Sequence, residues 1–305
     1  MVDGHRAEQA GIRDASLVTQ RHADLYDEVA HETARMIIHR YSTSFGLASR
    51  LLAQPVRGEV ENIYALVRVA DEIVDGVAAT AGQSPAEIRR MLDEFETETE
   101  RAMAEGYSTN LVIHAFAQTA RRADIGTDLT RPFFASMRAD ITEDRHSEQS
   151  FADYVYGSAE VVGLMCLQTF LVGVPVTDAQ RREFVAGARA LGAAFQKVNF
   201  LRDLSADVDA LGRSYFPGVD VATLDDATKM RLVADIDADL AVSAAIVPKL
   251  PRSSRKAVSL AQSLFAELNR RIERTPAAVL KTTRVSVPTA RKATLWLAAS
   301  IGKTP

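Results

Sequence analysis

The chain is short of cysteine, glycine and proline. A single cysteine among 305 residues excludes a disulfide framework and a zinc site built from cysteines, and it suits a reducing compartment. Sixteen glycines and ten prolines are about 5% and 3% of the residues, below the usual ~7% and ~5%. Because these two residue types interrupt helices most strongly, the composition favours long helices.

The sequence also lacks a strong charge of either sign and a long apolar run. Its 36 Lys+Arg and 40 Asp+Glu give a formal net charge of −4, which argues against a basic nucleic-acid-binding protein. The longest uncharged run, 161–177, contains Gly163, Gln168 and Pro175 and falls at or below the ~17–25 residues of a spanning helix. We expect a buried helix there, with a membrane span as the weaker alternative. Residues 1–20 contain no signal-peptide pattern, so we expect a cytoplasmic protein.

The hydrophobic pattern is helical over nearly the whole chain, without alternating strand patterns or hairpin turns. It predicts a single all-α domain over 1–305, in which 1–20 form a flexible N-terminal extension. The expected helices cover 22–40, 43–53, 57–80, 85–105, 108–123, 130–145, 150–171, 178–209, 227–246, 252–274 and 287–302.

Local signals mark some of the helix ends. Ser84, followed by proline and by Glu87 three positions on, has the pattern of a helix cap, and Thr177 opens the next long helix in a similar way. The stretch 211–226 is the clearest long loop, and 275–288 contains a second break between two prolines.

The first segment with chemical content lies in the helix expected over 57–80. At 100° per residue, Tyr64, Arg68, Asp71 and Asp75 fall within an arc of about 60°. Two carboxylates on one face repel each other unless a cation lies between them. This face therefore predicts either a site for a hard cation or a solvated face with an Arg68–Asp71 pair, and the segment alone favours the solvated face.

The second segment carries only oxygen-bearing side chains. Gln196, Asn199, Asp203 and Asp207 fall within an arc of about 80°, and phenylalanines border this stripe. A solvated helix face normally mixes lysine, glutamate and serine instead. Two helices that each present such side chains can face one another inside a bundle, and oxygen ligands without histidine select Mg²⁺ over zinc or iron.

Magnesium held by carboxylates is usually completed by substrate phosphates, which would also need donors. Ser42, Ser44, Arg68 and Arg213 are candidates, although helix capping alone also explains the two serines. None of the six histidines is placed to help; His114 and His146 stand alone, and we expect an isolated histidine to be structural or exposed rather than a ligand. No Walker-type loop and no dinucleotide glycine pattern is present, so ATP and NAD(P) are poorly supported.

At these residues the sequence resembles the squalene/phytoene synthase family, whose members join two prenyl diphosphates head to head. The similar segments, in family order, are YSTSF at 41–45, DEIVD at 71–75, YVYGSAEVVG at 154–163, QKVNFLRDLSAD at 196–207, GRSYFP at 212–217 and RVSVP at 284–288. The resemblance covers residues 30–295. Each segment is moderately specific, and their common order makes the set highly specific.

The resemblance implies a class I isoprenoid synthase fold, a single helical barrel around a central pocket. It implies that Mg²⁺, or alternatively Mn²⁺, is held by Asp71, Asp75, Asn199 and Asp203, with Asp207 close by. It implies that diphosphate is bound by Ser42, Ser44, Arg68, Gln196, Arg213 and Arg284. Tyr154 and Tyr215 would lie near the reacting carbons, so that the implied catalytic residues are Asp71, Asp75, Asp203, Asp207, Tyr154 and Tyr215.

Two positions depart from the family pattern. Glu160 stands where the family usually has glycine, in a stretch expected to line the pocket, and Phe265 stands where relatives often carry tyrosine near the diphosphates. Both departures concern substrate positioning.

The expected activity is condensation of two geranylgeranyl diphosphates to phytoene through a cyclopropylcarbinyl diphosphate, as in carotenoid biosynthesis. The apolar run 161–176 is expected to line a tunnel for the prenyl tails. No NADPH is expected, because reduction belongs to the squalene-type outcome, and a membrane anchor after residue 296 is not expected either. Peripheral membrane contact is expected for release of a water-insoluble product.

Alternatives remain open at this point. The chain could condense two farnesyl diphosphates to squalene or dehydrosqualene, or it could be a class I terpene cyclase on the same fold. A non-catalytic helical interaction protein is the third class, but it leaves the two carboxylate faces unexplained. The second segment, with Gln196 and the Asn199–Asp203 spacing, argues against the cyclase.

Overall fold

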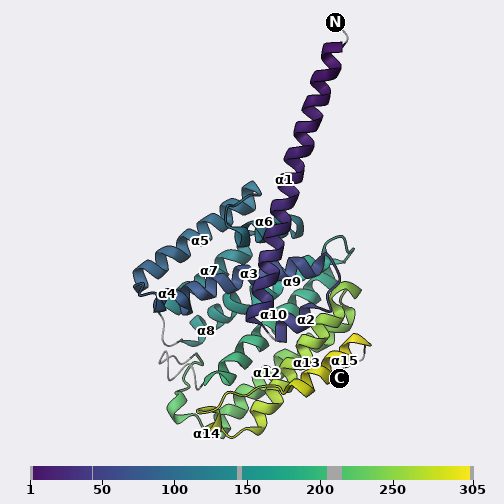
Figure 1. Cartoon of the computed structure of the whole chain (residues 1–305). Coiled ribbons are helices and arrows are strands. Elements are labelled where there is room, and N and C mark those ends of the chain that lie inside the picture. The colour runs from purple at the N-terminus through teal and green to yellow at the C-terminus, as the bar shows by residue number, and fades with distance from the viewer. Residues whose placement is uncertain (1–2, 43, 143–145, 205–214, 303–305) are drawn as a thin grey trace.

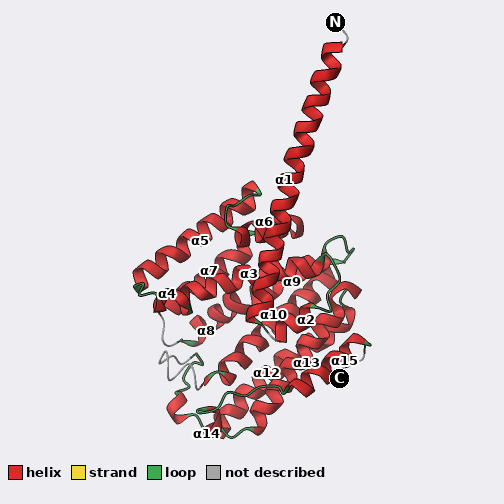
Figure 2. Cartoon of the chain, in the orientation of Figure 1, coloured by secondary structure: helices red, strands yellow, loops and turns green. Residues whose placement is uncertain are grey.

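The computed structural model describes residues 3–42, 44–142, 146–204 and 215–302, and of residues 3–20, 44 and 79 it describes the backbone alone. All regular structure in these ranges is helical (Figures 1 and 2). The predicted all-α class is therefore confirmed.

Eleven longer helices make up most of the described chain. They are α1 (Asp3–Tyr41), α3 (Val56–Asp75), α5 (Pro85–Glu105), α6 (Leu111–Ala123), α7 (Thr127–Thr142), α8 (Glu148–Val155), α9 (Val161–Leu171), α10 (Asp178–Arg202), α12 (Asp226–Ile246), α13 (Arg252–Arg274) and α15 (Thr289–Ser300). The short elements are α2 (Ser44–Ser49), α4 (Val77–Thr80), α14 (Ala277–Leu280), a π-turn (Tyr156–Glu160) and the 3₁₀ turns Val221–Thr223 and Val247–Lys249.

Several helices differ from their predicted extents. The helix expected over 43–53 covers only Ser44–Ser49, and the one expected over 57–80 ends at Asp75, before the short α4. Helix α1 begins at Asp3, well before residue 22, and its N-terminal part projects from the body of the molecule (Figure 1). The helix expected over 150–171 is divided by the π-turn, and α10 ends at Arg202 rather than at 209.

The predicted cap signals are confirmed. The Ser84 side chain accepts a hydrogen bond from the backbone N–H of Glu87, whose carboxylate accepts one from the Ser84 backbone N–H in return. Thr177 and Gln180 form the same reciprocal cap at the start of α10. Each cap satisfies backbone N–H groups that have no partner within the helix, so these helices begin where the sequence indicates.

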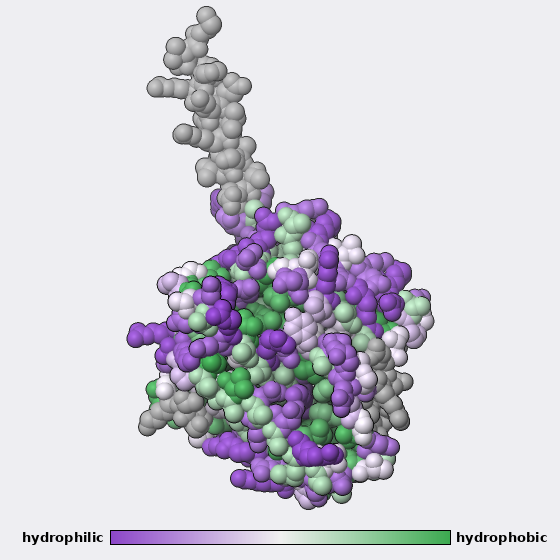
Figure 3. Space-filling model, turned by 180° about the vertical axis from the view of Figure 1, so that it is seen from behind, coloured by the Kyte–Doolittle hydropathy of each residue, from purple (hydrophilic) through white to green (hydrophobic). Residues whose placement is uncertain are grey.

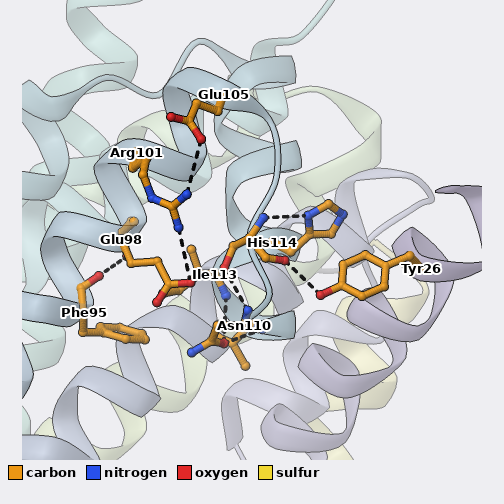
Figure 4. A network of polar contacts seen from close by, with 11 residues as sticks. Tyr26, Phe95, Glu98, Arg101, Glu105, Asn110, Ile113 and His114 are labelled. Atoms are coloured by element: carbon orange, nitrogen blue, oxygen red, sulfur yellow. Dashed lines mark hydrogen bonds and ion pairs between the residues drawn. The ribbon is translucent and has the colours of Figure 1, made fainter.

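Polar contacts fasten α1 to the loop between α5 and α6 (Figure 4). The Tyr26 hydroxyl donates to the Ser108 carbonyl at 2.9 Å, and the Asp27 carboxylate lies 2.6 Å from Nε2 of His114. His114 is buried, and its Nδ1 accepts from the Ser108 backbone N–H at 3.4 Å. His114 is therefore structural, which is one of the two roles expected for an isolated histidine.

Three hydrophobic clusters make up the core of the described residues, and the two larger ones lie in different sets of helices. The first joins α1, α3, α5, α6, α7 and α9, and the second joins α10, α12, α13 and α15. A cavity of about 720 Å³ lies where the two halves meet, lined by α3 and α9 from the first half and by α10, α12 and α13 from the second.

Two glycines let α10 approach closely to α9 and to the π-turn that precedes α9. A Cβ atom at Gly192 would lie 2.6 Å from the carbonyl oxygen of Ala159, and one at Gly163 would lie 2.7 Å from that of Ala188. Both distances are far below a normal carbon–oxygen contact, so only glycine fits at this crossing.

The surface facing away from the viewer of Figure 1 mixes hydrophilic and hydrophobic residues (Figure 3), as folded proteins usually do. Among the described helices, none is both long and apolar enough to cross a membrane. The uncharged run that raised this alternative forms α9, whose Val161, Met165 and Leu171 are buried.

Candidate functional site

The cavity has a polar part and an apolar part. Its polar lining residues are Tyr41, Ser42, Arg68, Gln196, Asn199, Arg202 and Arg284. Apolar residues that line it include Leu52, Leu167, Phe170, Phe184 and Leu250, which belong to one hydrophobic cluster. Residues Val162, Gly163 and Cys166 of α9 also line the cavity, so the expected contribution of 161–176 to its wall is borne out by five residues of α9.

Arg68 on α3 links the cavity to the first carboxylate face. Its guanidinium donates to Asp71 Oδ2 at 2.7 Å and to Glu72, and it lies 4.5 Å from the ring centroid of Tyr41. The predicted Arg68–Asp71 pair is therefore present. The pairing with Glu72 was not predicted, although Glu72 is four positions from Arg68 and one helical turn away.

The Asp71 carboxyl has an unusual affinity for protons. Burial raises its pKa to about 6, and the negative charges of Asp75 and Glu72 add to this effect, while Arg68 opposes it. A carboxylate that is costly to ionise without a cation is suited to a cation site. Asp75 follows one turn later on α3 and is exposed.

The second face lies at the C-terminal end of α10. Gln196 and Asn199 line the cavity, and Asp203 caps the helix, with its backbone N–H donating to the Asn199 carbonyl at 2.9 Å. The side-chain oxygen Oδ1 of Asn199 is buried and has no hydrogen-bond partner among the described residues. Asp207 lies outside the described residues.

Two arginines hold the Asp203 carboxylate. Arg202 donates through NH2 at 2.5 Å, and Arg284, from the segment before α15, donates through Nε at 2.5 Å. Burial alone would raise the pKa of Asp203, but the hydrogen bonds and charges of the two arginines outweigh it and lower the pKa. Both guanidiniums also line the cavity, so positive charge is concentrated at its polar part.

Ser42 both lines the cavity and caps a helix. Its hydroxyl accepts hydrogen bonds from the backbone N–H groups of Phe45 at 3.1 Å and Gly46 at 3.4 Å. The capping interpretation is therefore confirmed, and it is compatible with a place at the cavity wall. The side chain of Ser44 and the whole of Arg213 lie outside the described residues.

Tyr154 and Tyr215 belong to an aromatic cluster beside the second face, not to the cavity lining. Tyr215 stacks on Phe200 with ring centroids 4.0 Å apart, and Tyr154 lies 5.8 Å from Tyr215. The Tyr154 hydroxyl donates to the buried carboxylate of Asp140 at 3.0 Å. Burial, followed by the charge of Asp140, raises the pKa of Tyr154 well above its ordinary value.

The expected metal ligands are of the chemical types that bind a hard divalent cation. The expected ligands offer carboxylate and amide oxygens, and the buried Oδ1 atom of Asn199, which has no partner among the described residues, is a suitable ligand atom. Within the described ranges, however, no three His, Cys, Asp or Glu side chains lie close enough together to hold one ion. The side-chain types of the two pairs, Asp71 with Asp75 and Asn199 with Asp203, are those that a hard divalent cation binds.

The two departures from the family pattern have different surroundings. Glu160 ends the π-turn and accepts from Arg189 Nε at 2.5 Å; it does not line the cavity, although its neighbour Ala159 does. Phe265 does line the cavity and stacks on Phe195 with centroids 3.7 Å apart. Phe265 therefore adds apolar surface where a tyrosine would add a hydroxyl.

Arg202 is the cavity residue that sequence reasoning missed. It lines the cavity and binds Asp203, but it lies between Asn199 and Asp203 in the sequence and is a cation, whereas the stripe was defined by its oxygen-bearing side chains. The signal that could have identified Arg202 is that the carboxylates of the second segment need a nearby positive charge. Its side chain also reaches the same carboxylate as Arg284, which is far away in the sequence.

Comparisons with known proteins identify the family of the chain. Residues 38–291 match the family described as squalene/phytoene synthase. Phytoene synthase from Mycobacterium bovis is 28% identical over 294 residues, covering 89% of this chain and 91% of that protein. Chloroplastic phytoene synthase 3 from Zea mays is 31% identical over 63% of this chain, but the aligned part is only 44% of the maize protein.

Solved structures agree on the fold. A dehydrosqualene synthase crystallised with a ligand superimposes with a TM-score of 0.73 at 21% identity, covering 90% of this chain and 96% of that one. The chain therefore has the class I isoprenoid synthase fold, as the resemblance implied.

Proposed function

The chain belongs to the squalene/phytoene synthase family, and we propose that it joins two geranylgeranyl diphosphates through their first carbons to give 15-cis-phytoene. The observation that carries this proposal is the composition of the cavity. Guanidiniums and oxygen side chains at one part suit magnesium diphosphate, and an apolar remainder suits prenyl tails. The name of the mycobacterial relative, which aligns over 91% of its length, supports phytoene as the product.

The arginines would receive the leaving group. Arg68, Arg202 and Arg284 all line the cavity and present fixed cationic forks of the kind that bind phosphate oxygens. In the described structure they are occupied by acidic side chains, so diphosphate would compete with carboxylates of the same site. Charge placed in advance at the point where negative charge develops lowers the barrier to ionisation.

A divalent cation would be held by Asp71 and Asp75 on α3 and by Asn199 and Asp203 at the end of α10. When bound, it would supply positive charge to the diphosphate as the carbon–oxygen bond breaks. Mg²⁺ is the proposed ion, with Mn²⁺ as a substitute, because all of these ligands are oxygen donors.

The proposed reaction balances as two losses of diphosphate and two losses of a proton. The carbon–oxygen bond of the first prenyl diphosphate breaks, and the double bond of the second attacks the allyl cation to form a cyclopropylcarbinyl diphosphate and release a proton. That intermediate then loses its own diphosphate, rearranges and releases the second proton. Apolar walls such as Leu167 and Phe170 would keep out water, which would quench each cation.

No nicotinamide is proposed, because phytoene formation involves no reduction. Contact with a membrane is proposed for release of the product, since a long hydrocarbon leaves water for any apolar phase.

Product analysis tests this function. Purified protein is incubated with geranylgeranyl or farnesyl diphosphate and Mg²⁺, with and without NADPH, and the organic extract is analysed by mass spectrometry. We expect a C40 hydrocarbon from geranylgeranyl diphosphate, unchanged by NADPH and abolished by EDTA. A C20 hydrocarbon would identify a cyclase, preferential C30 formation would identify a squalene-type enzyme, and absence of diphosphate release would refute catalysis.

Two variants link the product to the proposed ligands. Asp71→Ala and Asp203→Ala should lose nearly all turnover while retaining the helical circular dichroism of the parent. Glu94→Ala, on the exposed face of α5, is the matched control for removal of a carboxylate and should retain activity. Unchanged product formation in either aspartate variant would refute the metal assignment.

A further inference from the structure

Charge is distributed very unevenly along the chain. Residues 249–305 contain twelve Lys or Arg and two Asp or Glu, which gives this segment a net charge of +10 in a chain whose total is −4. The preceding 248 residues therefore carry −14. An asymmetry of this size between segments indicates an anionic partner for the basic one.

The basic segment folds as an antiparallel pair of helices. Lys256, near the start of α13, donates to the carbonyl of Ser300 at the end of α15 at 2.6 Å, and Arg291, near the start of α15, pairs with Glu267 of α13 at 3.3 Å. The two helices lie side by side in Figure 1. Cationic side chains of α13 therefore flank both ends of α15.

Positive charge remains in excess at both ends. Near the start of α15, three guanidiniums surround the single carboxylate of Glu267, those of Arg270, Arg271 and Arg291. At the other end, Arg252, Arg255 and Lys256 are exposed in the first turns of α13. One carboxylate cannot neutralise three guanidiniums, so this surface attracts anions.

Between these charges, α15 presents an uncharged face to the outside. The exposed positions of α15 are Thr289, Ala290, Ala293, Thr294 and Leu297, and Ile301 directly after the helix is exposed as well. Together they fall within an arc of about 140°. Leu297 is 59% exposed and Ile301 is 63% exposed. The opposite face packs into the core through Leu295 and Ala299. Packing within the fold therefore does not explain why apolar residues stand on the outer face of α15.

This surface adjoins the cavity. Arg284, which lines the cavity and holds Asp203, lies in the segment that leads into α15. Helix α15 also contacts α2, whose residues Phe45 and Ala48 line the cavity.

We propose that α15 is a membrane-docking helix, whose exposed apolar face enters the interface of a bilayer that contains anionic lipids. An apolar helix face bordered by Lys and Arg is the pattern of helices that lie in the membrane interface, and basic residues beside it bind anionic headgroups. Only the reason for docking rests on the proposed function: docking through α15 would bring the cavity next to the bilayer, into which the hydrocarbon product would pass. The surface itself follows from exposure and charge alone.

Vesicle flotation without substrate tests the proposal. Full-length protein is mixed with vesicles of phosphatidylcholine, alone or with phosphatidylglycerol. We expect flotation with the anionic vesicles only, weakened by high salt. Binding should fall at least tenfold in the double variant Leu297→Gln with Ile301→Gln and fall measurably in Arg252→Glu. Two controls change exposed residues elsewhere: Val242→Gln on α12 matches the Leu297 and Ile301 changes, and Arg89→Glu on α5 matches Arg252→Glu. Both should bind like the parent.

The outcomes separate this inference from the proposed function. Absence of flotation with anionic vesicles, or equal binding by the α15 variants, would overturn it. So would light scattering that shows a dimer which the double variant abolishes without any vesicle binding, because the face would then meet a second copy of the chain. Activity is measured separately in detergent, where the α15 variants should match the parent; binding without a C40 product would refute only the reaction.

Discussion

The Arg284 guanidinium lies against the Asp203 carboxylate, with Nε 2.5 Å from Oδ1, although 81 positions separate the two residues. Arg202 binds the same carboxylate, with Nη2 2.5 Å from Oδ2. Asp203 is a proposed metal ligand, and both arginines are proposed to bind diphosphate. Each of these groups therefore already pairs with a group of the charge that it would meet in magnesium diphosphate. The site is therefore ordered by its own charges.

Arg284→Ala should weaken binding of diphosphate. The variant removes one charge-assisted fork, which corresponds to a loss of about tenfold in affinity when the exposure of the side chain is taken into account. Asp203 remains held by Arg202, so the fold should be unaffected. Isothermal titration with inorganic diphosphate and Mg²⁺ measures the loss, and Arg284→Lys, which keeps the charge without the fork, should bind with intermediate affinity. Parental affinity in the alanine variant would contradict this role.

Glu59 should make the stability of the protein depend on pH. It is 5% exposed on α3, neither carboxylate oxygen has a hydrogen-bond partner among the described residues, and burial raises its pKa despite the charges of Arg122 and His31. A raised pKa means that the folded state binds the proton more tightly than the unfolded state, whose glutamate pKa is about 4.3. The charged form therefore destabilises the fold above the raised pKa, and this cost disappears below about pH 4.

Glu59→Gln should accordingly have a higher urea midpoint than the parent at pH 8, and the difference should shrink as the pH falls towards 4. Glu94→Gln, which removes an exposed carboxylate from α5, is the control and should show no such trend. A lower midpoint of Glu59→Gln at pH 8 would show that the Arg122 pair outweighs the cost of burial.

Helix ends were predicted most accurately where nearby residues in the sequence mark them. Helix α5 spans Pro85–Glu105 as predicted because its start and end are set by Ser84 and Gly106, within one turn of the helix itself. The π-turn Tyr156–Glu160 was not predicted, because a single extra residue per turn leaves the hydrophobic pattern nearly unchanged over so short a segment. Its place is set by packing against α7, which no local signal records.

The candidate site was predicted in part for the same reason. Arg68, Asp71 and Asp75 were found because helical spacing alone places them on one face. The pairing of Arg284 with Asp203, which Arg202 also binds, depends on the tertiary fold, because it brings the segment before α15 next to the end of α10. Such contacts between distant segments follow from the tertiary fold and leave no periodicity in the sequence.

Tyr154 and Asp140 form a buried pair that can be separated by mutation. Both residues are about 5% exposed or less, and the hydroxyl donates to the carboxylate at 3.0 Å. Tyr154→Phe leaves a buried carboxylate with one donor fewer and should cost about 1–3 kcal/mol of stability. If Tyr154 acts near the reacting carbons, turnover should also fall at least tenfold with little change in KM.

Asp140→Asn distinguishes positioning from packing, because its amide oxygen can still accept from Tyr154. We expect this variant to retain most of the turnover, and Asp140→Ala to lose as much as Tyr154→Phe. The double variant Asp140→Ala with Tyr154→Phe should lose less stability than the sum of the single changes. Full turnover in Tyr154→Phe, with stability alone reduced, would make Tyr154 a core residue only.

Gly192 and Gly163 should not tolerate even a methyl group. At both positions an added Cβ would meet backbone carbonyl oxygen, at 2.6 Å and 2.7 Å, and backbone cannot rotate away as a side chain can. Overpacking of this kind costs about 1–3 kcal/mol, although alanine otherwise stabilises a helix interior by up to about 1 kcal/mol. Both glycines also line the cavity, so the separation of α9 from α10 should lower turnover as well as stability.

Gly58→Ala is the matched control for these two changes, because Gly58 also lies within a helix but its added Cβ would meet only the flexible side chain of Gln54, at 3.7 Å. It should be neutral or slightly stabilising. Urea denaturation of the three variants measures the difference. If Gly192→Ala were as stable as Gly58→Ala, the close crossing of α9 and α10 would not be required, and the cavity wall would be more adaptable than this packing implies.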